Sequence, residues 1–270
     1  MIYTFVLHDG KLAPRGAFSE DRFLEGFSLY EVFRVFDGRL LFPGDNIARL
    51  ENSARKSGRA FRVSPGLVAG QLERLIRLEG IKEGNIKYVL HAPGGNAGDR
   101  VEEYAYRVPH DYPGEADYRD GVKVITLEAA RENAEVKYIN PGLRSMADRL
   151  TREHGAREVL LVDGEGYITE GSRSNVFFAR GGKLYTAPVP RVLPGTTRKR
   201  VLEECARGGI TVVEECIALA DVGSVQAAFL TGTSTLVLPV RQINDTVLDA
   251  RDPLLRQVMA RYQALVVGSR

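Results

Sequence analysis

The sequence has little of several features that mark common functional classes. Its two cysteines, Cys205 and Cys216, have no cysteine or histidine at metal-ligand spacing, so neither a disulfide framework nor a metal site is expected. Its 37 basic and 35 acidic residues are interspersed, which argues against a nucleic-acid partner. No apolar run reaches the ~18 residues of a membrane span, and the N-terminus lacks the basic region and cleavage site of a signal peptide. We therefore expect a soluble, cytoplasmic protein with reduced cysteines and no membrane partner.

Two nucleotide-binding motifs are also missing. No G-x-x-x-x-G-K-[ST] follows a strand and no G-x-G-x-x-G opens a helix, so a P-loop or Rossmann enzyme is not favoured. The 270 residues do permit a large core, because a chain of this length buries roughly 70–75% of its unfolded surface. One large domain or two small ones are both compatible with this length.

The first third of the chain predicts a small α+β unit. The run 28–36, followed by Asp37-Gly38 and then 39–42, has the strand, turn and strand pattern of a hairpin. The other elements expected here are strands at 1–7, 89–91 and 103–108, a helix at 46–56 capped by Asp45, and a helix at 65–78.

A second unit is predicted after a polar segment broken by proline and glycine at 109–115. Its expected elements are a strand at 122–126, a helix at 141–154, strands within 159–178, and helices at 197–207 and 252–265. Strands and helices are mixed without strict alternation, which predicts an α/β (α+β) fold. We expect a small N-terminal α+β domain over 1–112, a linker over 113–121, and a larger C-terminal domain over 122–270.

An acid and a polar glycine turn stand between two apolar strands in the segment 164–178. The runs 159–162 and 176–178 read as buried strands, so Glu170 between them is expected near a sheet edge or core. A carboxylate in such a place needs a cationic or hydrogen-bonding partner.

Two further turns combine glycine with hydroxyl side chains. The segment 192–201 leads from Pro194-Gly195 into threonines at a helix start, where free amides suit a phosphate dianion. The segment 230–235 follows an apolar strand, and a turn of such small residues can form an anion-binding nest. Each signal alone is weak, because threonine at a helix start is ordinary.

Taken together, these motifs resemble the class IV aminotransferases, the fold-type IV enzymes that use pyridoxal 5′-phosphate (PLP). The family's Thr-Glu-Gly-x-x-x-Asn-x-Phe signature supplies the acid that pairs with the protonated pyridine nitrogen, and Glu170 matches it, with Ser174 and Asn175 in the same cofactor-binding segment. The resemblance implies two α/β domains with the cofactor between them, and a homodimer.

The family's phosphate segments match the two glycine turns. Leu-Pro-Gly-x-Thr-Arg and Thr-Gly-Thr imply that the amide of Thr196 and the side chains of Thr197 and Thr233 bind the PLP phosphate. Arg49 matches the family's phosphate arginine, although many relatives have histidine where this chain has Asn46. Without the resemblance, Arg49 would be read as a solvated helix residue.

The lysine that binds PLP covalently is implied to be Lys137. It lies on an apparent strand and begins the sequence Lys137-Tyr138-Ile139-Asn140, which matches the family pattern Lys-x-Leu/Ile-Asn before the acid signature. A lysine is a surface residue by default, so this assignment depends on the resemblance. The same amine is expected to be the base that moves the substrate's Cα proton.

The substrate site is predicted with less support. Tyr30 and Arg34 lie four residues apart on one strand and therefore on one face. We expect Arg34 or Lys87 to bind the substrate carboxylate, with Tyr30 as a wall or hydrogen-bond donor. A surface ion pair explains either cation equally well. Arg144 is another cation near Lys137 in sequence, for which a helix-surface role is expected.

The subfamily stays open because two known signatures are missing. The Arg-Gly-x-x-x-Arg-x-His loop of D-amino-acid transaminases is replaced by the segment 92–100, and the branched-chain Glu-Gly-x-Gly-Glu-Asn motif by Ser172-Arg173-Ser174-Asn175. The leading hypothesis is a transaminase acting on D-amino acids, because the segment 169–175 is closer to that branch. The alternatives are a branched-chain L-amino-acid transaminase, an aminodeoxychorismate lyase, and a non-catalytic protein that kept the fold.

Overall fold

The protein forms two compact units, as given by a computed structural model that describes residues 4–95, 98 and 100–269. One unit contains the described residues up to Asp111, together with Val136–Ile139 and Ser269. The other contains Tyr112–Glu135 and Asn140–Gly268. The chain therefore returns briefly to the first unit at Val136–Ile139, the segment that carries Lys137.

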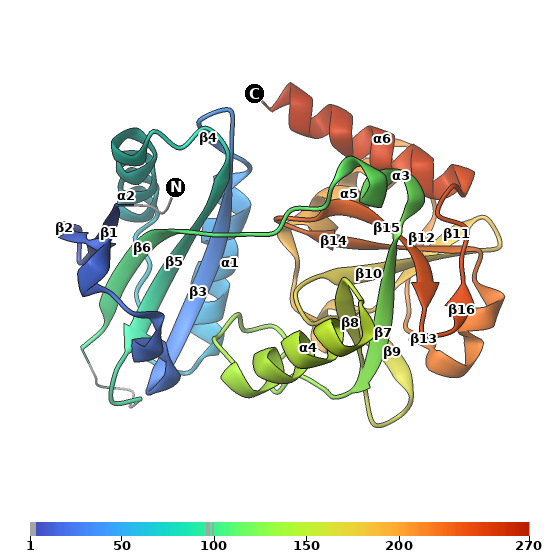
Figure 1. Cartoon of the computed structure of the whole chain (residues 1–270), viewed down its shortest axis with the longest axis horizontal. Coiled ribbons are helices and arrows are strands. Elements are labelled where there is room, and N and C mark those ends of the chain that lie inside the picture. The colour runs from blue at the N-terminus through green and yellow to red at the C-terminus, as the bar shows by residue number, and fades with distance from the viewer. Residues whose placement is uncertain (1–3, 96–97, 99, 270) are drawn as a thin grey trace. The chain divides into compact units, whose positions relative to one another are not determined.

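The first unit is an antiparallel sheet covered on one face by two helices (Figure 1). Its strand order is β2-β1-β6-β5-β3-β4 in the described residues. The strands are β1 (Phe5–His8), β2 (Lys11–Pro14), β3 (Phe27–Phe36), β4 (Arg39–Leu40), β5 (Gly84–Ala92) and β6 (Glu102–Val108), and the helices are α1 (Pro43–Lys56) and α2 (Pro65–Glu79). The expected hairpin is present, with Asp37 and Gly38 at positive φ in its turn.

Side chains alternate between the two faces of this sheet. On β3, Leu29, Phe33 and Val35 are fully buried and pack with the apolar sides of α1 and α2. Proline at the first position of each helix fits the start of a helix, where a backbone N–H would lack a partner. The hydrophobic core of the unit thus lies between the sheet and these helices.

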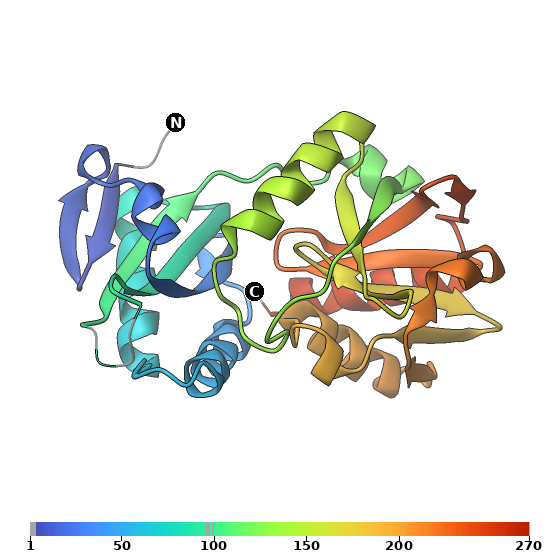
Figure 2. The same ribbon diagram turned by 90° about the horizontal axis from the view of Figure 1, so that it is seen from below.

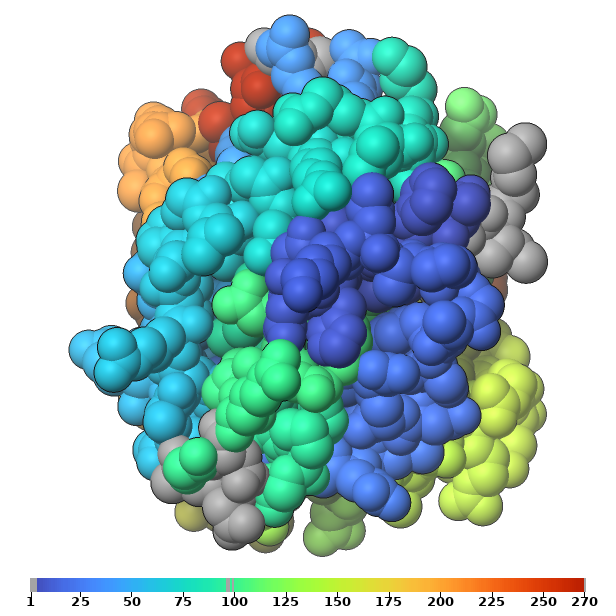
Figure 3. Space-filling model, turned by 90° about the vertical axis from the view of Figure 1, so that its left-hand side faces the viewer, coloured from blue at the N-terminus to red at the C-terminus, as the bar shows by residue number. Residues whose placement is uncertain are grey.

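The opposite face of the sheet carries an aromatic cluster. Its buried members are Val6, Phe18, Phe23, Val89, Tyr104 and Tyr106. Phe18 and Phe23 come from a segment with two short 3₁₀ turns, η1 (Arg15–Ala17) and η2 (Glu20–Leu24). Figure 3 looks onto this unit, where the β1–β2 hairpin (dark blue) and α2 (cyan to teal) lie side by side.

The second unit is built on a larger mixed sheet. In the described residues its order is β12-β11-β10-β14-β15-β7-β8-β9-β13, with β16 paired to β15. The bounds are β7 (Val122–Glu128), β8 (Glu158–Val162), β9 (Tyr167–Gly171), β10 (Asn175–Arg180), β11 (Lys183–Thr186), β12 (Val212–Glu214), β13 (Ile217–Ala218), β14 (Ala227–Gly232), β15 (Leu236–Ile243) and β16 (Thr246–Val247). Ile168 of β9 and Val176 of β10 share one apolar cluster although four strands separate β9 from β10 in this order, so the sheet curls around that cluster.

Helices pack on the other face of the curled sheet (Figures 1 and 2). The helix α4 (Pro141–His154) covers β7 and β8 through an apolar cluster around Ala147. The helices α5 (Thr196–Arg207) and α6 (Pro253–Gly268) pack on β14, and α6 also contacts β15. The remaining helical segments are α3 (Glu115–Asp120), η3 (Val189–Arg191) and η4 (Leu219–Ser224).

The structure differs from the elements expected from the sequence at two places. The helix α3 occupies most of the predicted linker 113–121 and belongs to the second unit. Lys137 is not on a regular strand, because its segment makes a single bridge between Tyr138 and Leu29 of β3. Residues 1–3 of the strand predicted at 1–7, and residues 96, 97 and 99 of the loop compared with the D-amino-acid signature, lie outside the described residues.

Three further features concern the residues that the structure covers: the cysteines, the possible metal ligands and the possible membrane spans. Cys205 and Cys216 are buried and unpaired. Among residues 4–95, 98 and 100–269, no group of acidic, histidine and cysteine side chains is arranged to hold a metal ion. Within the same residues, every helix is too short or too polar to cross a membrane.

Candidate active site

Glu170, the acid of the Thr-Glu-Gly motif, lies near the end of β9 and is 2% exposed. One carboxylate oxygen, Oε1, is 2.8 Å from the guanidinium Nε of Arg131. The other, Oε2, accepts hydrogen bonds from the side-chain amide of Asn175 at 3.3 Å and from the backbone N–H of Leu193 at 3.2 Å. A cation and two neutral donors therefore compensate the buried charge, as a buried carboxylate requires.

Arg131 is a candidate site residue that sequence analysis does not single out. It lies in the irregular segment between β7 and Val136, where no motif or periodicity distinguishes it from a surface arginine. Besides its ion pair with Glu170, its Nη2 donates to the backbone carbonyl of Ser172 at 2.5 Å. Arg131 thus contacts both the acid and the turn that follows the acid.

Asn175 joins three segments of the second unit. It begins β10, where it pairs with Thr231 near the end of β14. Its side-chain amide also donates to the carbonyl of Leu193 at 2.9 Å. Gly195, just before α5, lies so close to the Asn175 carboxamide oxygen that a Cβ there would collide with it. The start of α5 and the end of β14 are therefore both held beside the turn that carries Glu170.

Two buried threonine hydroxyl groups in this region lack a hydrogen-bond partner among the described residues. They are the Oγ1 atoms of Thr231, which is 1% exposed, and of Thr235. Gly232 lies beside them, and a Cβ on it would come 2.8 Å from the Thr235 hydroxyl. A buried polar group without a hydrogen bond lowers stability by roughly 1–3 kcal/mol. These hydroxyls therefore fit a site in which a polar ligand supplies the missing hydrogen bonds.

The start of α5 adds donors of the same kind. Thr196 and Thr197 are buried, and Gly195 provides no side-chain cap for the helix. The first amides of a helix have no partner within the helix, and its positive end favours an anion. With the hydroxyl-rich turn at 231–235, which contains the predicted Thr233, this arrangement fits a phosphate group.

Lys137 lies in the first unit, on an extended segment beside β3. Its carbonyl accepts a hydrogen bond from the backbone N–H of Tyr30 at 3.1 Å, and its own N–H donates to the hydroxyl of Ser53 at 3.1 Å. The backbone N–H of Ile139 donates to the carbonyl of Ser28 at 2.9 Å. The ammonium group is 4.6 Å from the centre of the Tyr30 ring. Backbone contacts thus fix the segment, and Tyr30 contacts the amine.

Arg49 is buried on α1 and forms a two-point ion pair with Glu31 of β3. Its Nε and Nη2 donate to the two Glu31 oxygens at 2.7 and 2.8 Å, and Asn46 also donates to Glu31 at 2.9 Å. The interpretation of Arg49 as a solvated helix residue is therefore wrong. A guanidinium has five N–H donors, so the pair with Glu31 is compatible with a second anionic ligand.

Glu31 is a second residue that sequence analysis does not single out. A signal for it is present, because strict alternation along 28–36 places Glu31 on the buried face with Leu29 and Phe33. An acid on that face needs a cation on the helix that covers it.

The Arg49 pair leads to a prediction about stability. Arg49→Ala should lower the free energy of unfolding of the cofactor-free protein by about 3–5 kcal/mol, because it leaves Glu31 buried without its cation. Arg55→Ala, an exposed arginine on the same helix, is the matched control and should change it by less than about 0.5 kcal/mol. Urea unfolding measures both, and equal values for the two variants would contradict the prediction.

The three predicted substrate residues share the aromatic face of the first unit. Tyr30 and Arg34 are both half-buried on β3, and Lys87 of β5 pairs with Val32 between them. The Lys87 ammonium is 5.4 Å from the Tyr30 ring centre and 2.9 Å from the carboxylate of Glu20. The Arg34 guanidinium is paired with Glu83 at 3.1 Å. Lys87 and Lys137 therefore contact the same aromatic ring, whereas Arg34 points to Glu83.

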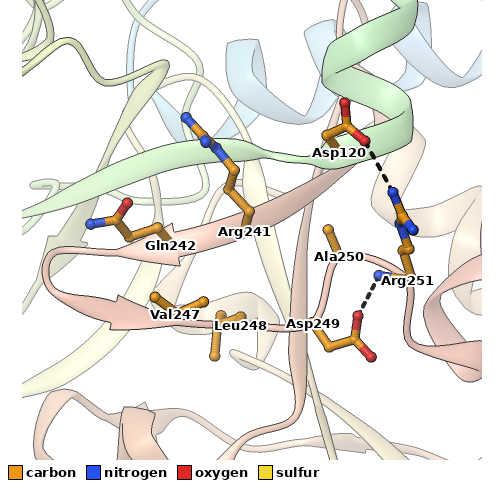
Figure 4. Close-up of a pocket in the computed structure, with 8 residues that line it drawn as sticks. All are labelled: Asp120, Arg241, Gln242, Val247, Leu248, Asp249, Ala250 and Arg251. Atoms are coloured by element: carbon orange, nitrogen blue, oxygen red, sulfur yellow. Dashed lines mark hydrogen bonds and ion pairs between the residues drawn. The ribbon is translucent and has the colours of Figure 1, made fainter.

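A surface cavity of about 340 Å³ in the second unit is separate from these groups. It is lined by Asp120, Arg241, Gln242, Val247, Leu248, Asp249, Ala250 and Arg251 (Figure 4). None of the predicted site residues lines it. Its charges are partly paired within the protein, since Arg251 is 3.5 Å from Asp120.

Comparison with known proteins identifies a matching family model and several similar relatives. The family model described as amino-transferase class IV matches residues 28–243. A D-alanine aminotransferase of Bacillus licheniformis is 30% identical over 280 residues, which cover 97% of this chain and 97% of the relative. A putative branched-chain-amino-acid aminotransferase of Methanocaldococcus jannaschii is 27% identical, with 84% of this chain and 82% of the relative covered.

Solved structures show the same fold. A branched-chain aminotransferase of the archaeon Thermoproteus uzoniensis, solved with norvaline, superposes with a TM-score of 0.87 at 24% identity, covering 98% of this chain and 95% of the other. A putative 4-amino-4-deoxychorismate lyase of Legionella pneumophila superposes with a TM-score of 0.82 at 24% identity, covering 95% and 97%. Another branched-chain enzyme of this fold, with a TM-score of 0.86 at 23% identity, was solved with pyridoxamine 5′-phosphate. The predicted α/β fold is thereby confirmed.

Proposed function

The chain belongs to the class IV aminotransferase family, and on this basis we propose that it uses PLP to move an amino group from a D-amino acid to a 2-oxo acid. The observation that carries the D-amino-acid assignment is the similarity to a D-alanine aminotransferase over 97% of both chains. The predicted closeness of the segment 169–175 to the same branch agrees with it.

The second unit would bind the ring and phosphate of PLP. Glu170 would pair with the protonated pyridine nitrogen, and its fixed position between Arg131, Asn175 and Leu193 supports this role. Thr231 and Thr235, whose buried hydroxyls lack partners among the described residues, support a phosphate site. Of the predicted phosphate ligands, Thr196 and Thr197 lie at the start of α5, and Thr233 lies in the turn at 231–235.

The first unit would supply the reacting amine. When bound, PLP supplies a ring that withdraws electrons from the substrate's Cα. Lys137 would hold the cofactor covalently and carry the proton that leaves Cα. Its segment is fixed by two backbone–backbone hydrogen bonds to β3 and one to the hydroxyl of Ser53, and its amine lies against Tyr30. Arg49, held in place by Glu31, would add a charge for the phosphate.

The assay that tests the proposal follows the visible absorbance of the PLP-loaded protein during single half-reactions. D-alanine and D-glutamate should convert the bound cofactor to pyridoxamine phosphate, and pyruvate or 2-oxoglutarate should restore it. Conversion by L-leucine and L-glutamate alone would instead identify a branched-chain L-amino-acid transaminase. Pyruvate release from aminodeoxychorismate, with no conversion by any amino acid, would establish the lyase.

We propose Lys87, rather than Arg34, as the cation that binds the substrate carboxylate. Lys87 contacts the same tyrosine ring as Lys137, and its present partner Glu20 is a half-exposed carboxylate that a substrate carboxylate can replace. Lys87→Met should raise KM for the amino acid by about 10- to 100-fold, the range for a lost charged hydrogen bond, with a smaller change in kcat. Steady-state kinetics measures both constants.

Arg34→Met is the comparison variant for this test. Its guanidinium is paired with Glu83, so the substitution should leave KM within about threefold of the parent. A larger increase in KM for Arg34→Met than for Lys87→Met would reverse the assignment.

We also propose a cytoplasmic homodimer, on family resemblance alone. Light scattering of the purified protein measures the mass, and twice the 29.8 kDa chain is expected.

A further inference from the structure

Glu158 is a buried acid outside the predicted site, at the start of β8. It is 4% exposed, and its Oε1 accepts a hydrogen bond from the backbone N–H of Arg173 at 2.6 Å. Burial raises the pKa of this carboxyl group, while the Arg173 amide and the charges of Arg173 and Arg144 act in the opposite direction. Keeping an acid at such a place costs stability, so its contacts call for an explanation.

The hydrogen bonds of the Glu158 carboxylate fall on the turn that joins Glu170 to Asn175. The turn is held by backbone bonds from Gly171 to the Ser174 carbonyl and from Ser172 to the Val159 carbonyl, each at 2.8 Å. The Arg173 amide has Glu158 as its acceptor instead of a backbone carbonyl. Glu158 therefore takes the place of a missing sheet partner in this turn.

The carboxylate also explains the glycine of the Thr-Glu-Gly motif. A Cβ on Gly171 would come 2.6 Å from Glu158 Oε1 and would collide with the hydroxyl of Ser174. The φ angle of Gly171 is not positive, so the glycine is required by space and not by backbone conformation. Glu158 is thus packed directly against the residue that follows Glu170.

Two arginines fix the same turn from other directions. Arg131 donates to the Ser172 carbonyl at 2.5 Å and pairs with Glu170. The side chain of Arg173 pairs with Asp148 of α4, which is also 3.8 Å from Arg144. With Glu158 packed against the turn, each of its residues from Gly171 to Arg173 has a specific anchor.

We propose that Glu158 is a positioning residue, which holds the Gly171–Ser174 turn so that Glu170 and Asn175 keep the geometry needed to bind the cofactor ring. The inference rests on the proposed function, because the position of Glu170 matters for catalysis only if Glu170 binds the ring nitrogen. Glu158 itself touches neither cofactor nor substrate in this role. It acts as an acceptor and a packing surface, two properties that glutamine shares.

The anchoring can be tested without cofactor by amide hydrogen exchange of the apoprotein. Glu158→Ala should speed exchange at Arg173 by about 10-fold or more, the effect of one lost hydrogen bond, and Glu158→Gln should restore the parent rate. Asn244→Ala is the control, because it removes side-chain bonds to Thr126 elsewhere in the second unit. It should leave exchange in the turn unchanged.

The effect on catalysis is tested with the PLP-loaded enzyme. Glu158→Ala should lower kcat by about 10²-fold, as expected for a misplaced catalytic group, with KM within about threefold. The visible circular dichroism of bound PLP should change, and Glu158→Gln should restore both properties. In a Glu170→Gln background, Glu158→Ala should have little further effect on kcat, because both changes act through the same acid.

Three results would overturn the inference: unchanged exchange at Arg173, additive losses in the double variant, or a glutamine variant as defective as alanine. If Glu158→Ala does not fold, Glu158→Asp tests the same contact, since it withdraws the carboxylate by one methylene. Parent-like exchange in that variant would overturn the inference. A parent protein that takes up no PLP contradicts the proposed function, and the apoprotein exchange still decides whether Glu158 anchors the turn.

Discussion

Replacing Lys137 by methionine should lower kcat for transamination by at least about 10⁴-fold, the upper range for the loss of an acid–base group. The variant loses both the amine that would bind PLP and the group that would carry the Cα proton. The fold should survive, because the Lys137 segment is held to Tyr30 and Ser53 by its backbone atoms. Loss of the amine's contact with the Tyr30 ring costs about 0.5–1 kcal/mol.

Two measurements check the role of Lys137. Borohydride reduction of the loaded parent, followed by peptide mapping, should place the pyridoxyl group on Lys137. Half-reaction kinetics should then show the loss in Lys137→Met, with Lys183→Met on the exposed end of β11 as the control that keeps parent activity. A pyridoxyl group on another lysine, or activity retained in Lys137→Met, refutes the assignment.

Replacing Glu170 by glutamine should lower kcat by about 10²- to 10⁴-fold while PLP stays bound. Glutamine keeps an acceptor for the Leu193 amide but has no charge to hold a proton on the ring nitrogen. The proposed phosphate groups are untouched, so the cofactor should survive dialysis. Stability should fall as well, because Arg131 loses its carboxylate partner.

The double variant Arg131→Met/Glu170→Gln separates these two effects. It removes both charges of the pair. Its free energy of unfolding should therefore be higher than that of Glu170→Gln, while its kcat should stay as low. Glu165→Gln, in the exposed turn between β8 and β9, is the control for a lost surface carboxylate. Thermal unfolding and single-turnover absorbance measure the two properties, and parent turnover in Glu170→Gln would rule out the role.

Local sequence signals determined most of the secondary structure. The helix predicted at 141–154 has those bounds, because Asn140 caps its start and Pro141 suits its first position. The hairpin at Asp37-Gly38 could also be predicted from the local sequence, since few residue pairs accept two successive positive φ angles. Alternation and helical period are properties of neighbouring residues, so they can be read without knowing the fold.

The sequence also determined the family, because each family motif consists of particular residue types at a fixed spacing. Glu170 between apolar strands and threonines after Pro194-Gly195 each carried a weak signal, and their combination with Lys137 matched one family. The family model confirms that assignment. The roles of individual residues stay predictions that the variants above test.

Only the tertiary structure decided which charges meet. The partners Arg49 and Glu31 lie on different elements, as do Glu170 and Arg131 or Glu158 and the Arg173 amide. No local pattern encodes such pairs, since they arise when chain folding brings distant segments together and burial forces each charge to find a partner. The same applies to Val136–Ile139, which joins the first unit through hydrogen bonds to β3 although both of its flanks belong to the second.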